Sequence, residues 1–493
     1  MSIAGVTYKL VIDAIRMLFG NTAAVVAGAI CELGPCPLGL IAKKTKLRIP
    51  DVKTVALSMY VHGIVTVVQE SGRQMVELNS FPALILSAPS ILLDQINSMH
   101  DLKDGYQYID VMRTAMLNGI IEIVPKDKKK GTKNAGFTPV QINASDNFLG
   151  ACDDLLKKGF LIRRVVDSQT FNTCDVFSLE RRIENLALSK KKTTVANEKD
   201  KKPTKVSAPL EQTYTLTINW PNICTFLRGR YIIQASQSFL KKNYSELMEN
   251  IILSTHAGDY NTYQHEMEKD DENLRGVRIS LPRLEYQRLV TLIPVNQHEQ
   301  LFNDLDDISA SQLYLLRQGD GSYWDVTTSK AIRNIQIQYI DSFLEQTLSP
   351  YYRRAFSYIR TLVVADTHQI EQGALLSEKD ARNSMFTLAK LGFVQMQSIP
   401  RNSTDKMINP KSIFVWRYDE NAAIEAFKTI IGEQSRRFLS RISHLHEEYE
   451  NNEQATVGNL TAAKTNEKRE KQLCCYNIAY VDALRLFLLF SEM

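Results

Sequence analysis

Side chains able to do catalytic or metal-binding chemistry are scattered along this sequence and form no recognised motif. The closest two of its eight His residues, His444 and His446, lie two positions apart, so on a helix their rings would point to different sides. The patterns of a Walker loop, a dinucleotide-binding loop, a zinc protease and a serine hydrolase are absent from the sequence. We therefore expect no enzyme, with no catalytic residue, no metal, no cofactor and no small-molecule substrate.

Cysteine usage and hydropathy indicate a soluble intracellular protein. The seven Cys are an odd number and none forms a C-x-x-C pair, which argues against a disulfide framework and a zinc ribbon. No stretch approaches the roughly 18–20 uninterrupted apolar residues of a membrane-spanning helix. Asp13 and Arg16 interrupt the apolar stretch near the N-terminus, so a signal peptide is not indicated. We therefore expect no association with a membrane.

Positive charge is concentrated in two short segments. Residues 126–133 contain five Lys and one Asp, and residues 190–205 contain seven Lys and two acidic residues. Because the formal net charge of the whole chain is only +4, the rest of the sequence is slightly acidic. A dedicated DNA-binding protein usually spreads its basic residues over a folded face. Any contact with nucleic acid is therefore expected to be auxiliary.

Basic residues beside predicted helices and turns are the candidates for contact with DNA phosphates. Such contacts would be independent of base sequence and sensitive to salt, and no Asn or Gln is obviously placed to read bases. A solvated face or an acidic protein partner is the alternative explanation, and it weighs most for Arg353, Arg354 and Arg382. The candidate DNA-binding residues are Lys43, Lys44, Lys46, Arg48, Lys53, Arg73, Lys126, Lys128, Lys129, Lys130, Lys133, Arg163 and Arg164.

The elements that would position these residues repeat along the chain. Three segments share a capped helix, a Gly and then two apolar-alternating runs, and the shared residues are Gly63, Gly159 and Gly392. A helix that leads directly into a strand needs a left-handed residue at its end, and Gly adopts that conformation without steric cost. Helices followed by a short twisted hairpin form a winged helix. A further segment, residues 239–326, has the same order of parts without the Gly.

The predicted fold class is mainly α, with α+β winged helices: four tandem winged-helix domains followed by a C-terminal antiparallel coiled-coil hairpin. The Lys-rich stretch between the second and third domains has few apolar residues and is interpreted as a linker. The expected boundaries are 1–85 for winged helix 1, 86–187 for winged helix 2, 188–207 for the linker, 208–345 for the divergent winged helix 3, 346–418 for winged helix 4 and 419–493 for the helical hairpin.

Two long helices are predicted for the hairpin. Over residues 422–449 and 473–490, apolar residues recur mainly at spacings of three and four, the pattern of packed helices in a coiled coil. The apolar stripe of the second helix is wider than one antiparallel neighbour can cover, so a further partner is expected there. The candidate partner-binding residues are Tyr476, Tyr480, Leu484, Phe487 and Phe490.

Three sets of stretches resemble one protein family. They are residues 37–42 (PLGLIA) with 52–57 (VKTVAL), residues 353–356 (RRAF) and 368–372 (HQIEQ) with 379–382 (KDAR) and Met385, and residues 414–418 (FVWRY). With the order of winged helices, linker and hairpin, they resemble the third-largest subunit of eukaryotic RNA polymerase III, which is related to the alpha subunit of general transcription factor E. The resemblance spans nearly the whole chain, and the third winged helix diverges most.

The resemblance implies a non-catalytic polymerase subunit in the nucleus, part of a heterotrimer bound on the polymerase clamp. The implied partners are the two fellow members of the heterotrimer, the clamp and other polymerase subunits, transcription factor IIIB and promoter DNA. The implied role is promoter recruitment, promoter opening and initiation of small non-coding RNA synthesis, such as tRNA and 5S rRNA.

A second hypothesis is a winged-helix scaffold subunit of another large assembly, with no role in DNA binding. The slightly acidic composition outside the two basic segments favours it modestly. Co-purification of polymerase subunits would support the first hypothesis, and co-purification of a set like the proteasome lid would support the second.

Overall fold

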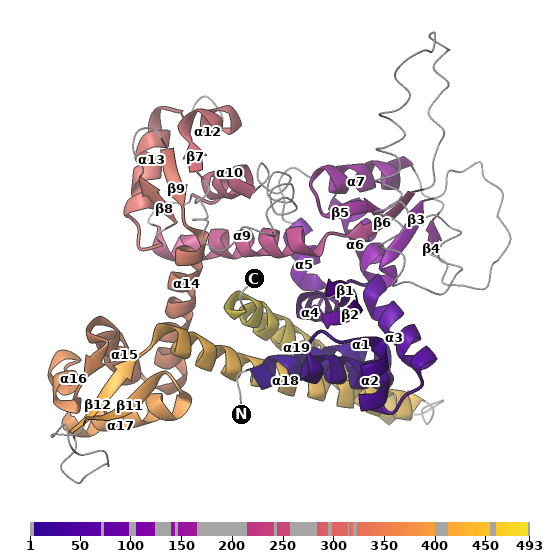
Figure 1. The fold of residues 1–493 in the computed structure, drawn as a ribbon. Coiled ribbons are helices and arrows are strands. Elements are labelled where there is room, and N and C mark those ends of the chain that lie inside the picture. Colours follow the sequence, from indigo (N-terminus) through magenta and orange to yellow (C-terminus); the bar gives the residue numbers. More distant parts are fainter. Residues whose placement is uncertain are drawn as a thin grey trace. The chain divides into compact units, whose positions relative to one another are not determined.

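The computed structural model describes most of the chain, in two compact units (Figure 1). The N-terminal unit comprises Thr7–Cys224 and Arg436–Val481, and the C-terminal unit comprises Met1–Val6, Thr225–Ser435 and Asp482–Met493. The described residues are 4–70, 73–97, 105–123, 140–142, 146–164, 214–240, 244–256, 283–293, 298–313, 315–318, 323–399, 413–453 and 460–491.

The first winged helix lies in the N-terminal unit. Gly63 follows its third helix with φ 75°, which is the left-handed conformation expected for a direct passage from helix to strand. The two strands of the wing pair antiparallel, from Val65 opposite Leu78 to Glu70 opposite Arg73. An isolated antiparallel bridge pairs Cys36 with Val76 on the other side of β2. Its elements are α1 (Ala4–Leu33), α2 (Leu38–Thr45), α3 (Ile49–Val61), β1 (Val65–Glu70) and β2 (Arg73–Leu78).

The second module completes the N-terminal unit around a sheet of order β4-β3-β6-β5. Gly119 and Gly159 take φ 71° and 75° where helices pass into strands. The module contains α4 (Ser80–Ser87), α5 (Ser90–Asn97), α6 (Gly105–Asn118), β3 (Ile120–Ile123), β4 (Val140–Ile142), α7 (Asp146–Lys157), β5 (Leu161–Arg164) and β6 (Tyr214–Ile218).

The pairing of strand β6 shifts the predicted boundary between the second and third modules. It pairs antiparallel with β3 on one side and with β5 on the other, so residues 214–218 belong to the second module rather than to the third. The predicted linker, residues 188–207, lies outside the described residues, but it now falls between two paired strands of one sheet. The sequence could not show this because hydrogen bonding between strands about fifty residues apart leaves no local pattern.

The third module lies in the C-terminal unit and is a divergent winged helix. Its sheet has the order β7-β9-β8, and both pairings are antiparallel. The expected order of helices and wing is found, although no Gly joins α13 to the wing. Its elements are α9 (Trp220–Phe239), most of which lies in this unit, α10 (Ser245–His256), β7 (Arg283–Glu285), α12 (Tyr286–Leu292), α13 (His298–Ala310), β8 (Leu316–Gln318) and β9 (Tyr323–Val326).

The fourth module is a winged helix whose helices α15, α16 and α17 pack beside β11 and β12 (Figure 1). Its sheet has the order β10-β12-β11. Asp366 and Gln369 form a capping box on α16, and the Ser377 hydroxyl caps α17 by accepting the Asp380 amide. Its elements are α14 (Thr328–Phe343), the π-helical turn η2 (Leu344–Leu348), α15 (Pro350–Leu362), β10 (Val364–Ala365), α16 (Thr367–Gly373), α17 (Glu378–Leu391), β11 (Val394–Ile399) and β12 (Ile413–Tyr418).

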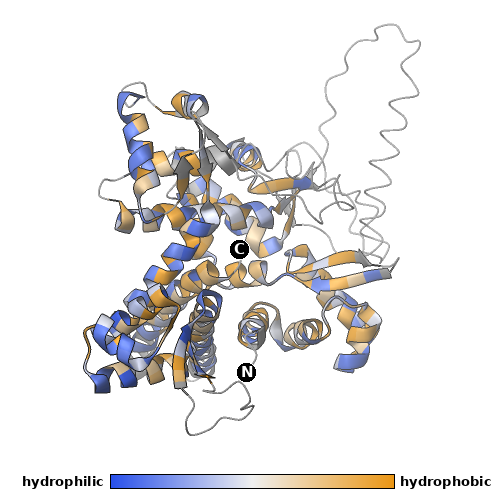
Figure 2. Cartoon of the chain, turned by 60° about the vertical axis from the view of Figure 1, so that its left-hand side comes forward, coloured by the Kyte–Doolittle hydropathy of each residue, from blue (hydrophilic) through white to orange (hydrophobic). Residues whose placement is uncertain are grey.

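The last two helices, α18 (Glu420–Glu453) and α19 (Leu460–Phe490), form the predicted antiparallel hairpin. In the N-terminal unit the Phe438 and Tyr476 ring centroids are 6.4 Å apart, and in the C-terminal unit those of Phe427 and Phe490 are 4.9 Å apart. The start of α18 therefore lies beside the end of α19, and the pair of Glu448 and Arg469 at 3.9 Å brings the end of α18 beside the early part of α19. Figure 2 shows hydrophilic and hydrophobic residues alternating around most helices, as packing through one apolar face requires.

The chain itself covers most of the apolar face of α19, which corrects the expectation of an open docking stripe. Tyr480, Leu484, Phe487 and Phe490 are at most 2% exposed. Tyr476 is half-buried. These residues are therefore unavailable as a surface for another protein, Tyr476 partly excepted.

Helices distant in the sequence provide this cover. In the N-terminal unit, the hydroxyls of Tyr480 and of Ser87 on α4 are 2.7 Å apart. In the C-terminal unit, the Gln336 side chain of α14 donates to the Leu489 carbonyl at 2.8 Å. Gly432 of α18 leaves room there for Phe487, whose ring a Cβ at that position would meet at 3.1 Å. The sequence comparison of α18 with α19 could not reveal these neighbours, because α4 and α14 are distant in the chain.

Within the described residues, two helices are long and apolar enough to cross a membrane, judged by length and composition alone: Val6–Leu33 and Lys468–Phe490. No such helix was expected, because only uninterrupted apolar runs were considered. Core helices of soluble proteins meet the same test, and the chain itself buries part of each helix. Leu10 and Val11 of α1 are fully buried, and Asp13 of α1 pairs with Arg436 of α18 at 2.9 Å.

Candidate nucleic-acid interface

The helix-turn-helix of the first module presents its basic residues to solvent. Ile41 and Ala42 of α2 and Val52 and Ala56 of α3 are buried. The opposite face of each helix is therefore exposed to solvent. Lys46 joins the helices with φ 59°, a left-handed conformation that residues other than Gly rarely adopt. The buried faces of α2 and α3 thus set the direction of the basic side chains around the turn.

The charges of this turn are largely uncompensated. Lys43, Lys44, Lys46 and Arg48 are exposed, and Lys44 alone of these forms an ion pair, at 2.9 Å from Glu32, within the described part of the chain. Both partners of that pair are more than half exposed, so it contributes little and is screened by salt. We call Lys43, Lys46 and Arg48 the basic turn.

The start of α3 adds little positive potential to the basic turn. Arg48 stands at the N-cap of α3 in an extended conformation, and its side chain makes no capping hydrogen bond. In the first turn of α3, Pro50 has no amide hydrogen to donate and Asp51 carries a negative charge. The positive charge at this place therefore comes from the side chains of the basic turn.

The other two candidate DNA-binding residues of the first module, Arg73 and Lys53, do not join the basic turn. Arg73 pairs with Glu70 in the register of β1 and β2, but its side chain lies outside the described residues. Lys53 lies on α3, half-buried and engaged with a neighbour. The structure therefore gathers Lys43, Lys44, Lys46 and Arg48 in one place and leaves the other two candidates aside.

The basic residues of the second module are paired with carboxylates where they are described. Arg163 contacts Asp153 at 3.1 Å and Lys157 contacts Asp154 at 3.2 Å. The Tyr108 hydroxyl also donates to Asp154 at 2.9 Å, and this hydrogen bond is the main reason that the pKa of Asp154 is lowered. The candidates Lys126, Lys128, Lys129, Lys130 and Lys133, and the side chain of Arg164, lie outside the described residues.

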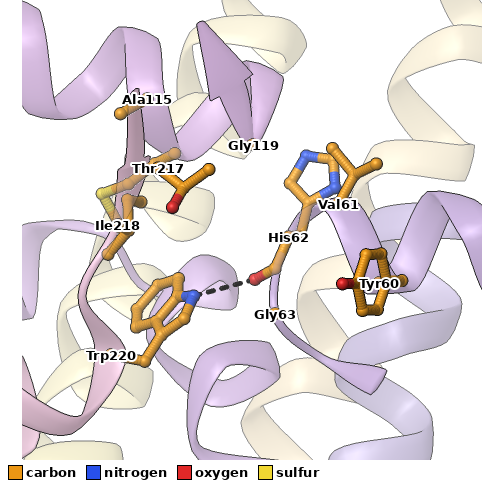
Figure 3. Close-up of a pocket in the computed structure, with 10 residues that line it drawn as sticks. Tyr60, Val61, His62, Gly63, Ala115, Gly119, Thr217, Ile218 and Trp220 are labelled. Atoms are coloured by element: carbon orange, nitrogen blue, oxygen red, sulfur yellow. Dashed lines mark hydrogen bonds between the residues drawn. The ribbon is translucent and has the colours of Figure 1, made fainter. Parts of the chain in front are cut away.

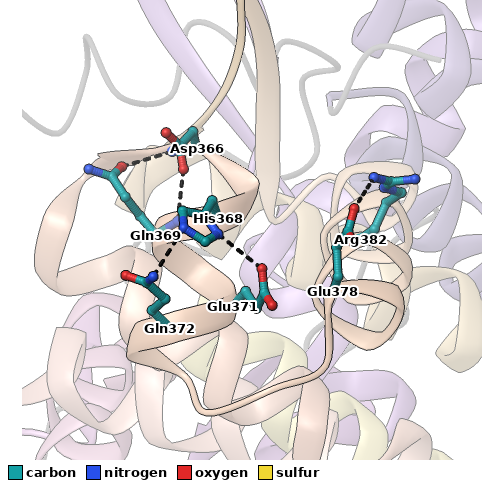
Figure 4. Close-up of polar contacts among 7 residues, drawn as sticks. All are labelled: Asp366, His368, Gln369, Glu371, Gln372, Glu378 and Arg382. Atoms are coloured by element: carbon teal, nitrogen blue, oxygen red, sulfur yellow. Dashed lines mark hydrogen bonds and ion pairs between the residues drawn. The ribbon is translucent and has the colours of Figure 1, made fainter.

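The three arginines of the fourth module that the sequence singled out, Arg353, Arg354 and Arg382, are engaged within the module. Arg353 contacts Glu345 at 2.5 Å, and Arg382 contacts Glu378 at 2.6 Å. The Arg354 guanidinium lies over the Tyr351 ring, 5.2 Å from its centroid. Figure 4 shows the polar groups of α16 and α17 satisfying one another, including His368 with Glu371 at 3.1 Å. Among the residues of this module that the structure describes, no cluster of cations is comparable with the basic turn.

A small pocket lies where the first and second modules meet inside the N-terminal unit (Figure 3). Its volume is about 50 Å³, room for a few water molecules. The Trp220 indole donates to the His62 carbonyl at 2.9 Å, and a Cβ on Gly63 would lie 2.5 Å from the Trp220 ring. The residues lining the pocket are Tyr60, Val61, His62, Gly63, Ala115, Met116, Gly119, Thr217, Ile218 and Trp220.

Contacts around this pocket join the two modules. The His62 ring packs edge-on against Phe19 and faces the Ser58 carbonyl at 2.9 Å within the first module, and its Nε2 lies 3.3 Å from the Leu117 carbonyl of the second module. The sequence analysis did not identify Trp220, because its role depends on the close approach of Gly63. Among the described residues, no group of His, Cys, Asp or Glu side chains is arranged to hold a metal ion.

Known proteins resemble parts of this chain. Residues 340–418, which span the fourth module, match the family model described as POLR3C, C-terminal winged-helix domain. DNA-directed RNA polymerase III subunit RPC3 of Candida albicans is 26% identical over 102 residues, covering 21% of this chain and 17% of the relative. The same subunit of Kluyveromyces lactis is 26% identical over 154 residues, covering 31% and 22%. That of Scheffersomyces stipitis is 26% identical over 141 residues, covering 29% and 23%.

The matches span about a fifth of the length of these curated relatives. They agree with the family indicated by the sequence stretches around Arg353, His368 and Trp416, all of which lie inside residues 340–418. The predicted resemblance is therefore confirmed: this chain is similar to subunit RPC3 of DNA-directed RNA polymerase III.

Proposed function

We propose that this chain is a non-catalytic subunit of DNA-directed RNA polymerase III that contacts DNA phosphates through the basic turn of its first module. The similarity of residues 340–418 to the POLR3C winged-helix domain carries the polymerase assignment. The uncompensated charges of Lys43, Lys46 and Arg48 beside the start of α3 support the DNA contact.

The proposed contact positions DNA without reading its sequence. Helix α3 would face the groove in a winged helix, yet residues 49–61 contain no Arg, Asn or Gln to read base edges, and their one Lys, Lys53, is half-buried and engaged with a neighbour. Asp51 in its first turn would oppose close approach to a phosphate. The cations lie instead before α3, where they suit a backbone that passes the turn.

Within the polymerase, we place this chain in a nuclear heterotrimer on the clamp, next to promoter DNA. Its proposed role is recruitment through transcription factor IIIB and support of promoter opening before small non-coding RNA synthesis. A cluster of winged helices joined by packed helices suits this role, because it gives several surfaces at fixed distances within each unit.

Two measurements on the full chain test these two claims separately. Affinity purification of the tagged chain from cells should recover the polymerase III subunits in stoichiometric amounts. Recovery of another large assembly without them would overturn the polymerase assignment.

For the DNA contact, the combined substitution Lys43→Glu, Lys46→Glu and Arg48→Glu should lower duplex affinity on the order of tenfold or more and flatten its salt dependence. The matched control is Lys330→Glu, Arg437→Glu and Arg441→Glu, which makes the same change of charge at exposed positions of other helices. Equal effects of the two triple variants would show that net charge alone matters and would remove the basic turn as a site.

The alternative of a scaffold subunit without a DNA role has its own support. In the second and fourth modules, the described basic side chains largely contact carboxylates or other groups of the same module. If the scaffold hypothesis is right, the Lys43, Lys46 and Arg48 variant should assemble normally and bind duplex DNA as weakly as the unmodified chain.

A further inference from the structure

Three large apolar side chains are half exposed on one side of the fourth module. Phe386 of α17 is 52% exposed, Met396 of β11 is 51% exposed and Phe414 of β12 is 47% exposed. We call these three residues the wing patch. Single exposed apolar residues are common on soluble proteins, whereas a contiguous group of them marks an interaction surface.

The wing patch is contiguous because all three residues adjoin the indole of Trp416. Met396 lies directly opposite Trp416 in the antiparallel pairing of β11 and β12. Phe414 lies two residues before Trp416 and therefore on the same face of β12. The Phe386 ring centroid is 5.2 Å from that of Trp416, at an interplanar angle of 88°.

The indole of Trp416 is itself fixed. It is 3% exposed, and its Nε1 donates to the Thr367 hydroxyl of α16 at 3.0 Å. The Phe386 ring therefore rests on a support that α16, α17 and β12 hold in place. Such preorganisation lowers the entropy cost of binding, because the apolar side chains are already held in position.

The same pair of aromatic residues recurs in the third module. Phe302 of α13, the helix before that wing, is 43% exposed. Its ring centroid is 5.6 Å from that of Trp324 on β9, and Trp324 is 1% exposed. In both modules of the C-terminal unit, a half-exposed Phe on the helix before the wing rests on a buried Trp of the returning strand.

The apolar character of the wing patch favours a protein partner over nucleic acid. Residues 367–391 contain three basic and three acidic residues, whereas residues 392–418 contain four basic residues and one acidic residue, so the positive charge of this module lies on its wing segment. The carboxylates are engaged: Glu371 pairs with His368 and Glu378 with Arg382 (Figure 4), and Asp380 accepts from the Ser377 hydroxyl.

Two lysines beside the patch keep their charge uncompensated. Lys379 and Lys390 are exposed and have no carboxylate partner within the described residues. Lys390 follows Phe386 by one helical turn and so lies on the same side of α17. A partner that covers the wing patch would bury apolar surface and meet these cations at its rim.

We propose that the wing patch binds a segment of another protein that carries large apolar side chains flanked by carboxylates. The apolar side chains pack over Phe386, Met396 and Phe414, and a carboxylate pairs with Lys390. This inference rests on the proposed function only in that the partner is sought in the polymerase assembly.

The test replaces Phe386 with the photo-reactive residue p-benzoylphenylalanine in the tagged full chain. The complex is purified from cells and irradiated, and the cross-linked peptides are identified by mass spectrometry. We expect cross-links to a protein segment with Asp or Glu within a few residues of large apolar residues. Cross-links confined to nucleic acid, to this chain itself or to a segment without acidic residues would overturn the inference, as would an absence of cross-links.

The composition of the same eluate distinguishes this inference from the proposed function. A cross-linked acidic segment in a complex without polymerase subunits would keep the inference and overturn the polymerase assignment. Polymerase subunits without such a cross-link would do the reverse.

A second measurement uses variants without the photo-reactive group. The double variant Phe386→Ser and Met396→Ser should reduce retention of the cross-linked partner at least tenfold, and Lys390→Glu should reduce it about threefold. The matched control is Leu117→Ser, which removes an apolar side chain that is 73% exposed on α6. Unchanged retention in variants whose thermal unfolding matches that of the unmodified chain would contradict the proposed surface.

Discussion

The first and fourth modules share one helix-turn-helix backbone and differ in the side chains placed on it. In both, a residue with left-handed φ joins the second helix to the third: Lys46 at 59° and Leu375 at 53°. Residues 38–61 contain five basic residues and one acidic residue, whereas residues 367–391 contain three of each. The shared geometry therefore does not by itself imply contact with DNA, because the charge around the turn decides what it attracts.

The exposed side chains of the first and fourth modules differ in the same way. Leu375 is 81% exposed, at the position where the first module has a lysine. The fourth module also exposes Phe386, Met396 and Phe414, while the corresponding third helix of the first module exposes Ile49, Asp51 and Thr54. The first module thus exposes cations around its turn together with Leu40, Ile49 and Val68, and the fourth module exposes larger apolar side chains on α17 and its wing strands.

The largest expected effect is on the free energy of unfolding, when the two glycines that lead into the wings are replaced by Ala. A Cβ on Gly63 would lie 2.5 Å from the Trp220 ring, whereas a Cβ on Gly392 would lie 3.1 Å from the Ala426 Cβ. Both have positive φ, so both Ala substitutions cost strain. Gly63→Ala should lower the free energy of unfolding by about 3 kcal/mol and Gly392→Ala by about 1–2 kcal/mol.

Urea unfolding of the full chain, followed separately by probes in each unit, would measure these two costs. Equal losses at Gly63 and Gly392 would mean that left-handed strain alone sets the cost and that the approach of Trp220 contributes nothing.

An exchange of side chains between the two turns tests the role of charge directly. Lys46→Leu should remove one phosphate contact, lowering duplex affinity about threefold and reducing the salt slope by about one. Leu375→Lys should change affinity less than twofold, because the carboxylates of Glu371 and Glu378 offset the Arg354 guanidinium, which donates to the Leu375 carbonyl at 3.4 Å. Salt titrations by fluorescence anisotropy give both quantities, and a gain at Leu375→Lys equal to the loss at Lys46→Leu would contradict the comparison.

A smaller effect concerns the strain at Leu375. Asn tolerates left-handed φ better than Leu does, so Leu375→Asn should raise the free energy of unfolding by about 0.5–1 kcal/mol. Duplex affinity should not change, since the side chain carries no charge in either form. Lower stability in thermal unfolding would show that Leu375 makes contacts whose loss outweighs the strain.

The smallest effect lies in the second module and depends on pH. The hydrogen bond from Tyr108 lowers the pKa of Asp154, so the folded state holds this carboxylate ionised to lower pH than the unfolded state does. Its contribution to stability is therefore present above the ordinary carboxyl pKa and is lost as pH falls through the lowered value. Tyr108→Phe should raise the pKa of Asp154 in an NMR titration and weaken this acid dependence, and an unchanged pKa would contradict it.

Particular elements show how far the sequence alone could be interpreted. The repeated helix, Gly and hairpin predicted the wings at Gly63, Gly159 and Gly392, and the fold class, mainly α with winged helices, is confirmed. The basic turn could be identified because five basic residues lie within eleven positions of the sequence. The pairing of Arg353 with Glu345 and of Arg382 with Glu378 could not be distinguished from a solvated basic face.

What the sequence determined by itself is local: the periodicity of its helices, the glycines that let helices pass into strands, and the charges gathered around one turn. The tertiary structure decided the rest. It joined β6 to a sheet across about fifty residues, covered α19 with α4 and α14, and seated Phe386 on Trp416. The physical reason is that backbone conformation depends on neighbours in the chain, whereas burial and pairing depend on residues that only folding brings together.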